Sequence, residues 1–170
     1  MIRLAEEHTI AFKEEMQEAF QHGFQAYNKD DSEDSNQWQV LPDEDFYRSL
    51  RAEGAEAYEA IDADGQRVGG AIITIDSSMH EGELAFLYVK VGVQSKGIGQ
   101  AIWKAIEAMH PEVELWETCT PYFDRRNIHF YINRCGFHAV EFFNEHHPDP
   151  HMPEQFDQED GLFKFEKRIK

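Results

Sequence analysis

A loop that could bind an anion through its backbone follows an apolar strand in the middle of the chain. The strand is expected from Leu84 to Val93, and the next residues are Gln94-Ser95-Lys96-Gly97-Ile98-Gly99. A helix is indicated after them, because apolar residues recur at spacings of three and four. These residues are Ile98, Ala101, Ile102, Ala105, Ile106 and Met109. Since the first turn of a helix leaves N–H groups unpaired, and glycine allows close approach, this order predicts a site for a phosphate-bearing ligand such as a pyrophosphate.

Two common phosphate-binding loops do not fit these residues. A Walker loop needs Gly-Lys-Ser/Thr, but Lys96 precedes Gly97. A dinucleotide fingerprint needs a third small residue for close helix packing, and Ile102 is bulky. The loop instead resembles the Gln/Arg-x-x-Gly-x-Gly/Ala signature of the GCN5-related N-acetyltransferase (GNAT) family, matched by Gln94, Gly97 and Gly99 in register.

The resemblance covers roughly residues 55 to 143 and includes the order of elements around the loop. In that family a strand, the loop, a helix, another strand and a second helix ending in Gly-Phe follow one another. The counterparts here are Glu83 to Val91, Gly97 to Met109, Val113 to Cys119, and Asp124 to Cys135 followed by Gly136-Phe137. The resemblance implies an α/β fold, with a mixed central sheet of about six or seven strands and about four flanking helices. It also implies direct acetyl transfer from acetyl-CoA to a primary amine. No acyl-enzyme is expected, because neither Cys has a recognisable base partner in the sequence.

The resemblance further implies which residues contact the cosubstrate. The family uses strand amides, the glycine loop and the later helix. The corresponding residues are Tyr88, Val89 and Val91 on the strand, Gln94, Ser95, Lys96, Gly97, Ile98, Gly99 and Gln100 in the loop and helix, and Asn127 and Tyr131 on the later helix. The amides of Tyr88, Val89, Lys90 and Val91 would also stabilise negative charge on the thioester oxygen. No metal is expected.

A base or a water relay is needed, because an alkylamine of pKa about 10.4 is mostly cationic at neutral pH. Glu83 begins the strand before the loop, and simple alternation would place it on one face with Ala85, Leu87 and Val89. Histone-acetylating members of the GNAT family carry a catalytic Glu at a position that resembles Glu83. Glu81 or His80 could serve instead, and Glu83 could be an ordinary solvated carboxylate.

Tyr131 is the candidate to protonate the departing thiolate, a role that a Tyr of the later helix usually has in this family. Asn127 lies four residues earlier, on the same helical face. Family members place this Tyr four residues before the Gly of Gly-Phe, but that position is Ile132 here. The offset could turn Tyr131 toward the core, whereas a bulged helix would restore its direction. A thiol of pKa near 8.5 could also leave unprotonated.

The charge of the chain argues against nucleic-acid binding. There are 33 acidic and 16 basic residues, and the net charge is −17. Such a surface repels polyanions and attracts a cationic amine, although solubility or a salt-adapted host would explain the charge equally well. An anionic cosubstrate would need positively charged side chains near its phosphates. The candidates are Lys96, Lys104, Arg125 and Arg126.

The 170 residues suit one domain, residues 1–170, with its own core. The N-terminal residues are too polar for a signal peptide, and the longest apolar run, Ala71 to Ile75, is too short to span a bilayer. Cytoplasmic residence is therefore expected, with no membrane partner. Cys119 and Cys135 have no metal or redox spacing, so free thiols are expected.

The remaining elements are predicted from periodicity and turn residues. A helical stripe includes Phe12, Met16, Ala19, Phe20, Phe24 and Tyr27. A polar segment, 29–37, and a short helix, Asp43 to Arg51, could form a flap over the site. Strands are expected at Ala55 to Asp62 and Val68 to Ile75, joined at Asp64-Gly65, and at His138 to Phe143 and Leu162 to Glu166.

Several alternatives remain open at this stage. His146, His147, Asp149 and His151 could bind zinc or nickel, but three prolines interrupt them and a surface loop is preferred. This loop, Asn144 to Gly161, could contact the acceptor. Trp38, Trp116, Tyr122 and Phe123 could form an aromatic wall for a cation, or simply pack. A non-catalytic acyl-CoA-binding sensor is the alternative function. A homodimer is possible, and the amine acceptor is not identified.

Overall fold

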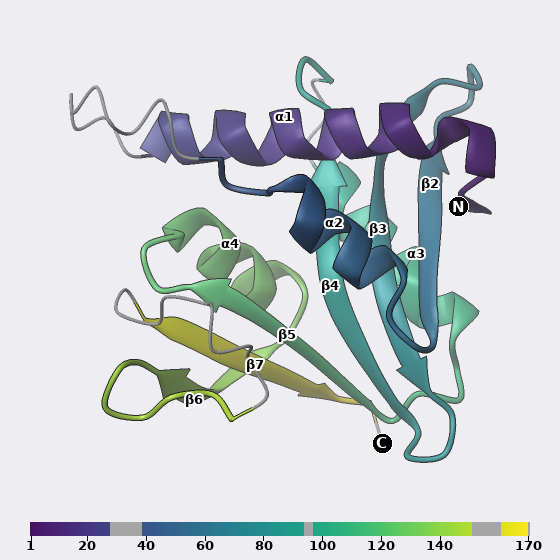
Figure 1. Ribbon diagram of the computed structural model, residues 1–170. Coiled ribbons are helices and arrows are strands. Elements are labelled where there is room, and N and C mark those ends of the chain that lie inside the picture. The colour runs from purple at the N-terminus through teal and green to yellow at the C-terminus, as the bar shows by residue number, and fades with distance from the viewer. Residues whose placement is uncertain (28–38, 94–96, 151–160, 170) are drawn as a thin grey trace.

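The computed structural model describes residues 1–27, 39–93, 97–150 and 161–169. They form a seven-stranded mixed sheet with helices on both faces (Figure 1), which confirms the predicted α/β class with a mixed central sheet of six or seven strands. The strands are β1 (Ile2–Arg3), β2 (Ala55–Ile61), β3 (Arg67–Asp76), β4 (Glu81–Val89), β5 (Leu115–Pro121), β6 (His138–Phe143) and β7 (Leu162–Arg168). The helices are η1 (Glu6–His8), α1 (Thr9–Tyr27), α2 (Asp43–Leu50), α3 (Ile98–Met109), α4 (Arg125–His129) and a π-helical turn, η3 (Phe130–Arg134).

The sheet order is β1-β2-β3-β4-β5-β7-β6. Neighbouring strands are antiparallel except β4 and β5, which are parallel and connected through α3. The predicted hairpin at Asp64-Gly65 joins β2 and β3. Asp62 accepts hydrogen bonds from the N–H groups of Asp64 and Gln66, and Gly65 has a φ of 80°. These turn residues therefore form the hairpin at the predicted position.

β4 and β5 pair over only three positions and then diverge (Figure 1). The last pair is Glu83 with Glu117, and the described residues contain no β4–β5 pair beyond it. Thr118, the next residue of β5, donates its hydroxyl to the Leu84 carbonyl over 2.8 Å. We call the diverging backbones beyond this point the fork. Along the fork, no strand among the described residues pairs with this edge of β4.

A β-bulge at Ala85 changes which side chains of β4 share a face. Ile73 pairs with Leu84 and Ile72 with Phe86, so Ala85 has no partner in β3. Ala85 and Phe86 both pack toward α1 and α2, whereas Leu84 and Leu87 pack toward α3. Glu83 therefore shares a face with Ala85, as expected from simple alternation, but the expectation that Leu87 and Val89 lie on the same face is wrong, because the extra residue reverses the pattern after Ala85.

Two apolar cores lie on opposite faces of the sheet. One contains Ile102, Trp103 and Ile106 of α3, and the other lies under α1 and α2. The predicted stripe of α1 is confirmed in its first half, since Phe12 and Met16 are fully buried. None of the helices in the described residues has the length and apolar character needed to cross a membrane.

α1 crosses the sheet and continues beyond β4 (Figure 1). Its Phe20 ring lies 5.8 Å from that of Phe86 on β4. One helical turn later, the Phe24 ring lies 6.0 Å from that of Phe123, just after β5. α1 therefore contacts both sides of the fork.

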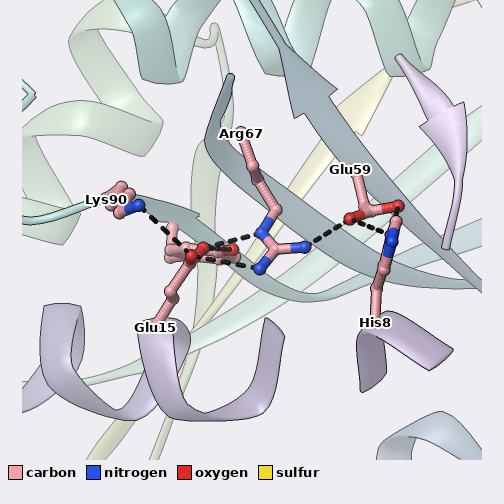
Figure 2. A network of polar contacts seen from close by, with 6 residues as sticks. His8, Glu15, Glu59, Arg67 and Lys90 are labelled. Carbon is pink, nitrogen blue, oxygen red and sulfur yellow. Dashed lines mark hydrogen bonds and ion pairs between the residues drawn. The ribbon is translucent and has the colours of Figure 1, made fainter. Parts of the chain in front are cut away.

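A partly buried ionic network fastens α1 to the sheet (Figure 2). Arg67 of β3 donates to Glu15 of α1 over 2.7 Å and to Glu59 of β2 over 2.5 Å. His8 Nδ1 lies 3.1 Å from Glu59 Oε2, and Lys90 Nζ lies 3.4 Å from Glu15 Oε1. The residues come from η1, α1, β2, β3 and the turn after β4, and periodicity along the chain could not have paired them.

Candidate functional site

The N-terminus of α3 begins directly after the glycine loop. Gly97 has φ 96° and ψ 6°, a left-handed conformation that other residues rarely adopt. No side chain caps the helix, and a Cβ on Gly97 would meet nothing within 4 Å. Glycine is therefore required here for its backbone conformation, and the unpaired N–H groups of the first turn are suited to an anion. Gln94, Ser95 and Lys96 lie outside the described residues.

Gly99 is needed for a different reason. A Cβ at this position would lie 3.1 Å from the Phe130 ring of the π-helical turn. The next residue, Gln100, donates its amide to the Arg134 carbonyl over 2.8 Å. Ile98 packs against the α3 core. The first turn of α3 is thus in contact with the turn that carries Tyr131.

The strand before the loop ends earlier than predicted, at Val89, and Val91 lies in the turn that follows. Lys90 donates its N–H to the Val68 carbonyl over 2.8 Å, so this amide is engaged with β3. Because N–H groups alternate between the two edges of a strand, that of Tyr88 also points toward β3, and those of Leu87 and Val89 point toward the fork. Val89 and Leu87 therefore direct their amides toward the fork, whereas Tyr88 and Lys90, which the sequence suggested for this role, do not. Leu87 was not among the sequence candidates.

Glu83 lies at the base of the fork, on the face toward α1 and α2. Its side chain is exposed, yet surrounding protein raises the pKa of its carboxyl by desolvation, and the charge of Glu117 raises it further. Lys164 of β7 partly opposes this shift, while Asp149 adds to it. Lys164 Nζ itself lies 2.8 Å from Glu117 Oε1. An accessible carboxylate with a raised pKa is suited to accept a proton near neutral pH.

The alternative bases lie farther from the fork. His80 is in the β3–β4 turn with φ 57°, and its Nδ1 lies 3.2 Å from the Glu112 carbonyl oxygen. Glu81 is the first residue of β4, at the same end of the strand. Glu83 is therefore the carboxylate of this strand that adjoins the point of divergence.

Tyr131 is buried, and its hydroxyl approaches the same point from the opposite face. Its ring packs 5.8 Å from that of Phe137 and 5.9 Å from that of Phe165. Desolvation raises its pKa well above the usual range, and a hydrogen bond with the Thr118 side chain opposes the shift. Because Thr118 also bonds to the Leu84 carbonyl, Tyr131 reaches the base of the fork through the core.

Comparison with known proteins identifies the family. The acetyltransferase (GNAT) family model matches residues 10–137. The chain belongs to the GNAT acetyltransferase family. The Bacillus subtilis protein YrkN, described as uncharacterized, is 45% identical over 138 residues, which are 77% of this chain and 74% of YrkN.

Solved GNAT structures share the fold at low sequence identity. The ribosomal-protein-S18-alanine N-acetyltransferase of Escherichia coli has a TM-score of 0.66 at 14% identity, covering 99% of this chain and 92% of its own. PaiA N-acetyltransferase from Thermoplasma acidophilum, in complex with coenzyme A, has a TM-score of 0.65 at 19% identity, covering 98% and 96%. A Bacillus subtilis acetyltransferase in complex with CoA has a TM-score of 0.58 at 22% identity, covering 76% and 86%.

Asn127 takes part in a helix cap within this GNAT domain. Its N–H donates to Asp124 over 3.1 Å and its side-chain amide over 2.8 Å. Both bonds lie at the N-terminus of α4, where an Asp cap is favoured. The basic candidates Lys104, Arg125 and Arg126 are all exposed, on α3 and α4.

The other sequence candidates have ordinary structural environments. His147 Nε2 lies 2.9 Å from Glu141, and His146 pairs with Glu145. Among the described residues no group of three or more His, Cys, Asp or Glu side chains could hold a metal, and His151 lies outside them. Trp116 is fully buried and cannot line a substrate site, and Trp38 is not described.

Both cysteines are free, as expected. The Cys119 side chain lies on β5 beside Lys164, its partner on β7. The Cys119 side chain is exposed, yet desolvation by surrounding protein, followed by the charge of Glu83, raises the pKa of its thiol to about 12. Desolvation likewise raises the pKa of Cys135 to about 12. Neither thiol is therefore activated as a nucleophile at neutral pH.

Proposed function

We propose that this protein is an acetyl-CoA-dependent N-acetyltransferase that acts on the primary amine of a small cationic acceptor. The observation that carries the proposal is the divergence of β4 and β5 immediately after Glu83 and Glu117. Among the described residues it leaves one edge of β4 without a strand partner, and an exposed carboxylate with a raised pKa lies at the base of that edge.

The cosubstrate site is proposed from the fit of the backbone. The uncapped first turn of α3 after Gly97 suits a pyrophosphate, and the amides of Leu87 and Val89 are directed toward the fork. Bound acetyl-CoA would supply the thioester that is attacked. Two structures with this fold hold coenzyme A, which supports the assignment. We place Gln94, Ser95, Lys96, Ile98 and Gly99 in the same site.

Glu83 is proposed as the base. An acceptor amine with a pKa of about 10.4 must lose a proton before it can attack. The Glu83 carboxylate is accessible, and its raised pKa makes it a better proton acceptor than an unperturbed carboxylate. Two strand amides, those of Leu87 and Val89, are then in a position to stabilise the oxyanion.

Tyr131 is proposed as the proton donor to the leaving thiolate. The desolvation that raises its pKa keeps the hydroxyl protonated throughout the ordinary pH range. The hydrogen bond with Thr118 orients that hydroxyl toward the base of the fork. The direct mechanism is favoured over an acyl-enzyme because desolvation by the surrounding protein raises the pKa of the Cys119 thiol and keeps it protonated.

The acceptor is proposed to be a cation with an apolar body. Glu83, Glu117 and Asp149 contribute negative charge on one face of the fork. The rings of Phe86 and Phe123 lie on its two sides, where they contact α1. The net charge of −17 would also attract such an acceptor.

Calorimetry with coenzyme A and a thiol-release assay test this function together. The amine panel should contain polyamines, amino sugars, amino acids, drug amines and peptides with free N-termini. We expect saturable coenzyme A binding and acceptor-dependent thiol release that is greatest with cationic amines. Binding without acceptor-dependent release across the panel would favour the non-catalytic sensor. Absence of coenzyme A binding would reject both functions.

A further inference from the structure

Gln100 lies in the first turn of α3, where the sequence predicts contact with the cosubstrate. Its side chain instead contacts the π-helical turn, where its Nε2 donates to the Arg134 carbonyl over 2.8 Å. Arg134 is the last residue of the π-helical turn Phe130–Arg134. The mechanism proposed above gives Gln100 no role, so this contact needs its own explanation.

A second contact joins the same two elements. The Phe130 ring lies against Gly99, where a Cβ would be only 3.1 Å from it. Phe130 and Arg134 are the two ends of the π-helical turn. Tyr131 lies between them, so the turn that carries it is held against α3 at both ends.

The π-helical turn is an uncommon conformation, and contacts from neighbouring elements can stabilise it. Its backbone bond runs from the Cys135 N–H to the Phe130 carbonyl over 3.0 Å, a spacing of five residues instead of four. Such turns are rare and occur as single turns within α-helices, often at functional sites. The carbonyls at a helix C-terminus lack intrahelical donors, and Gln100 supplies one to Arg134.

We propose that Gln100 is a positioning residue, whose hydrogen bond to the Arg134 carbonyl fixes the π-helical turn so that the Tyr131 hydroxyl reaches the base of the fork. The proposal rests on the proposed function, in which Tyr131 donates a proton. It assigns Gln100 to the alignment of Tyr131 and removes it from the cosubstrate contacts predicted by sequence.

A double-mutant cycle with Tyr131 tests the proposal. Gln100→Met removes the donor but keeps the length and helix preference of the side chain. We expect kcat to fall roughly tenfold, because a small misplacement of a reacting group is costly, while KM for acetyl-CoA stays within about twofold. In the Tyr131→Phe background, Gln100→Met should have little further effect on kcat, since the group that it positions is already absent.

Asn133→Ala is the matched control, because it removes an amide hydrogen bond on the same turn that does not reach α3. The Asn133 Nδ2 lies 2.8 Å from His129 Nδ1. We expect its kcat to remain within about twofold of wild type. A raised KM for acetyl-CoA with unchanged kcat in Gln100→Met would place Gln100 on the cosubstrate. Independent effects of Gln100→Met and Tyr131→Phe would also overturn the proposal.

Hydrogen exchange gives a readout that does not depend on activity. The Cys135 and Phe137 amides bond to the Phe130 and Tyr131 carbonyls, over 3.0 and 2.9 Å. These two amides should exchange faster in Gln100→Met than in wild type. In Asn133→Ala they should exchange at the wild-type rate. If no amine is acetylated by wild type, the proposed function fails, whereas unchanged protection in Gln100→Met rejects the positioning role itself.

Discussion

At the scale of single residues, the site uses one physical effect for two opposite tasks. Desolvation raises the pKa of both Glu83 and Tyr131. For Glu83 the shift moves proton acceptance closer to neutral pH. For Tyr131 it keeps the hydroxyl protonated and able to donate. Environments that make one titratable group a base and another an acid are common at sites of proton transfer.

Glu83→Gln should lower kcat/KM by about 10²- to 10³-fold at neutral pH, because the amide cannot accept the proton. Activity should recover partly at high pH, where more of the amine is already neutral. The test is a pH profile of thiol release with the best acceptor. If the profile of Glu83→Gln has the same shape as that of wild type, Glu83 is not the base.

Glu117→Gln should move the acidic limb of that profile to lower pH. The charge of Glu117 raises the pKa of Glu83, and its loss also leaves Lys164 free of a partner that lies 2.8 Å away. Both changes favour the ionised form of Glu83. The variant should therefore keep more activity than wild type in mild acid. If the acidic limb of the Glu117→Gln profile stays at the wild-type pH, a group other than Glu83 controls that limb.

At the scale of elements, much of the fold could be predicted and the critical irregularities could not. α3 was expected from Gly97 to Met109 and spans Ile98–Met109, because its apolar spacing is regular. The bulge at Ala85 and the π-helical turn each add one residue to a regular element. Periodicity cannot locate an added residue, so Leu87 and Val89 were wrongly placed on the face of Glu83, and the sequence left two alternatives open for the offset of Tyr131 from the family pattern. The π-helical turn is a bulge of the kind considered, and Tyr131 is nevertheless buried in the core.

Thr118→Val tests the junction of β4, β5 and the π-helical turn. Thr118 is 1% exposed and donates to the Leu84 carbonyl over 2.8 Å. Valine has nearly the same shape as threonine, but it has no hydroxyl to donate to the Leu84 carbonyl or to hydrogen-bond with Tyr131. We expect the free energy of unfolding to fall by about 1–3 kcal/mol, measured by urea denaturation with tryptophan fluorescence.

Thr118→Ser is the control, since it keeps the hydroxyl and loses only a methyl group. It should be destabilised by no more than about 1 kcal/mol. Equal losses in the Val and Ser variants would show that packing matters at this position and that the hydrogen bond does not.

At the scale of the whole molecule, the attachment of α1 depends on charges that the sheet buries. Arg67→Ala would leave Glu59, whose side chain is 2% exposed, without its guanidinium partner. Since an uncompensated buried charge is costly, we expect a loss of about 3 kcal/mol in the free energy of unfolding. Arg48→Ala removes an exposed pair with Asp45 and should cost no more than about 1 kcal/mol. Urea denaturation of both variants gives the comparison.

The same network predicts how stability depends on pH and salt. Ion pairing and hydrogen bonds lower the pKa of Glu15 and of Glu59 in the folded protein. Their stabilisation is therefore fully present above the unfolded pKa, about 4.3, and is lost as pH falls through the lower folded values. The stability difference between wild type and Arg67→Ala should be constant near neutral pH and should shrink below about pH 4.5.

Repulsion from the net charge of −17 acts in a different range. It is greatest at neutral pH, declines as carboxylates protonate, and is screened by salt, whereas a partly buried network is screened less. Raising NaCl from roughly 0.02 to 0.5 M should therefore increase the Tm of both proteins at neutral pH without changing the difference between them. A difference that collapses in salt, or that persists unchanged in acid, would show that α1 is held by other contacts and that Arg67 acts mainly at the surface.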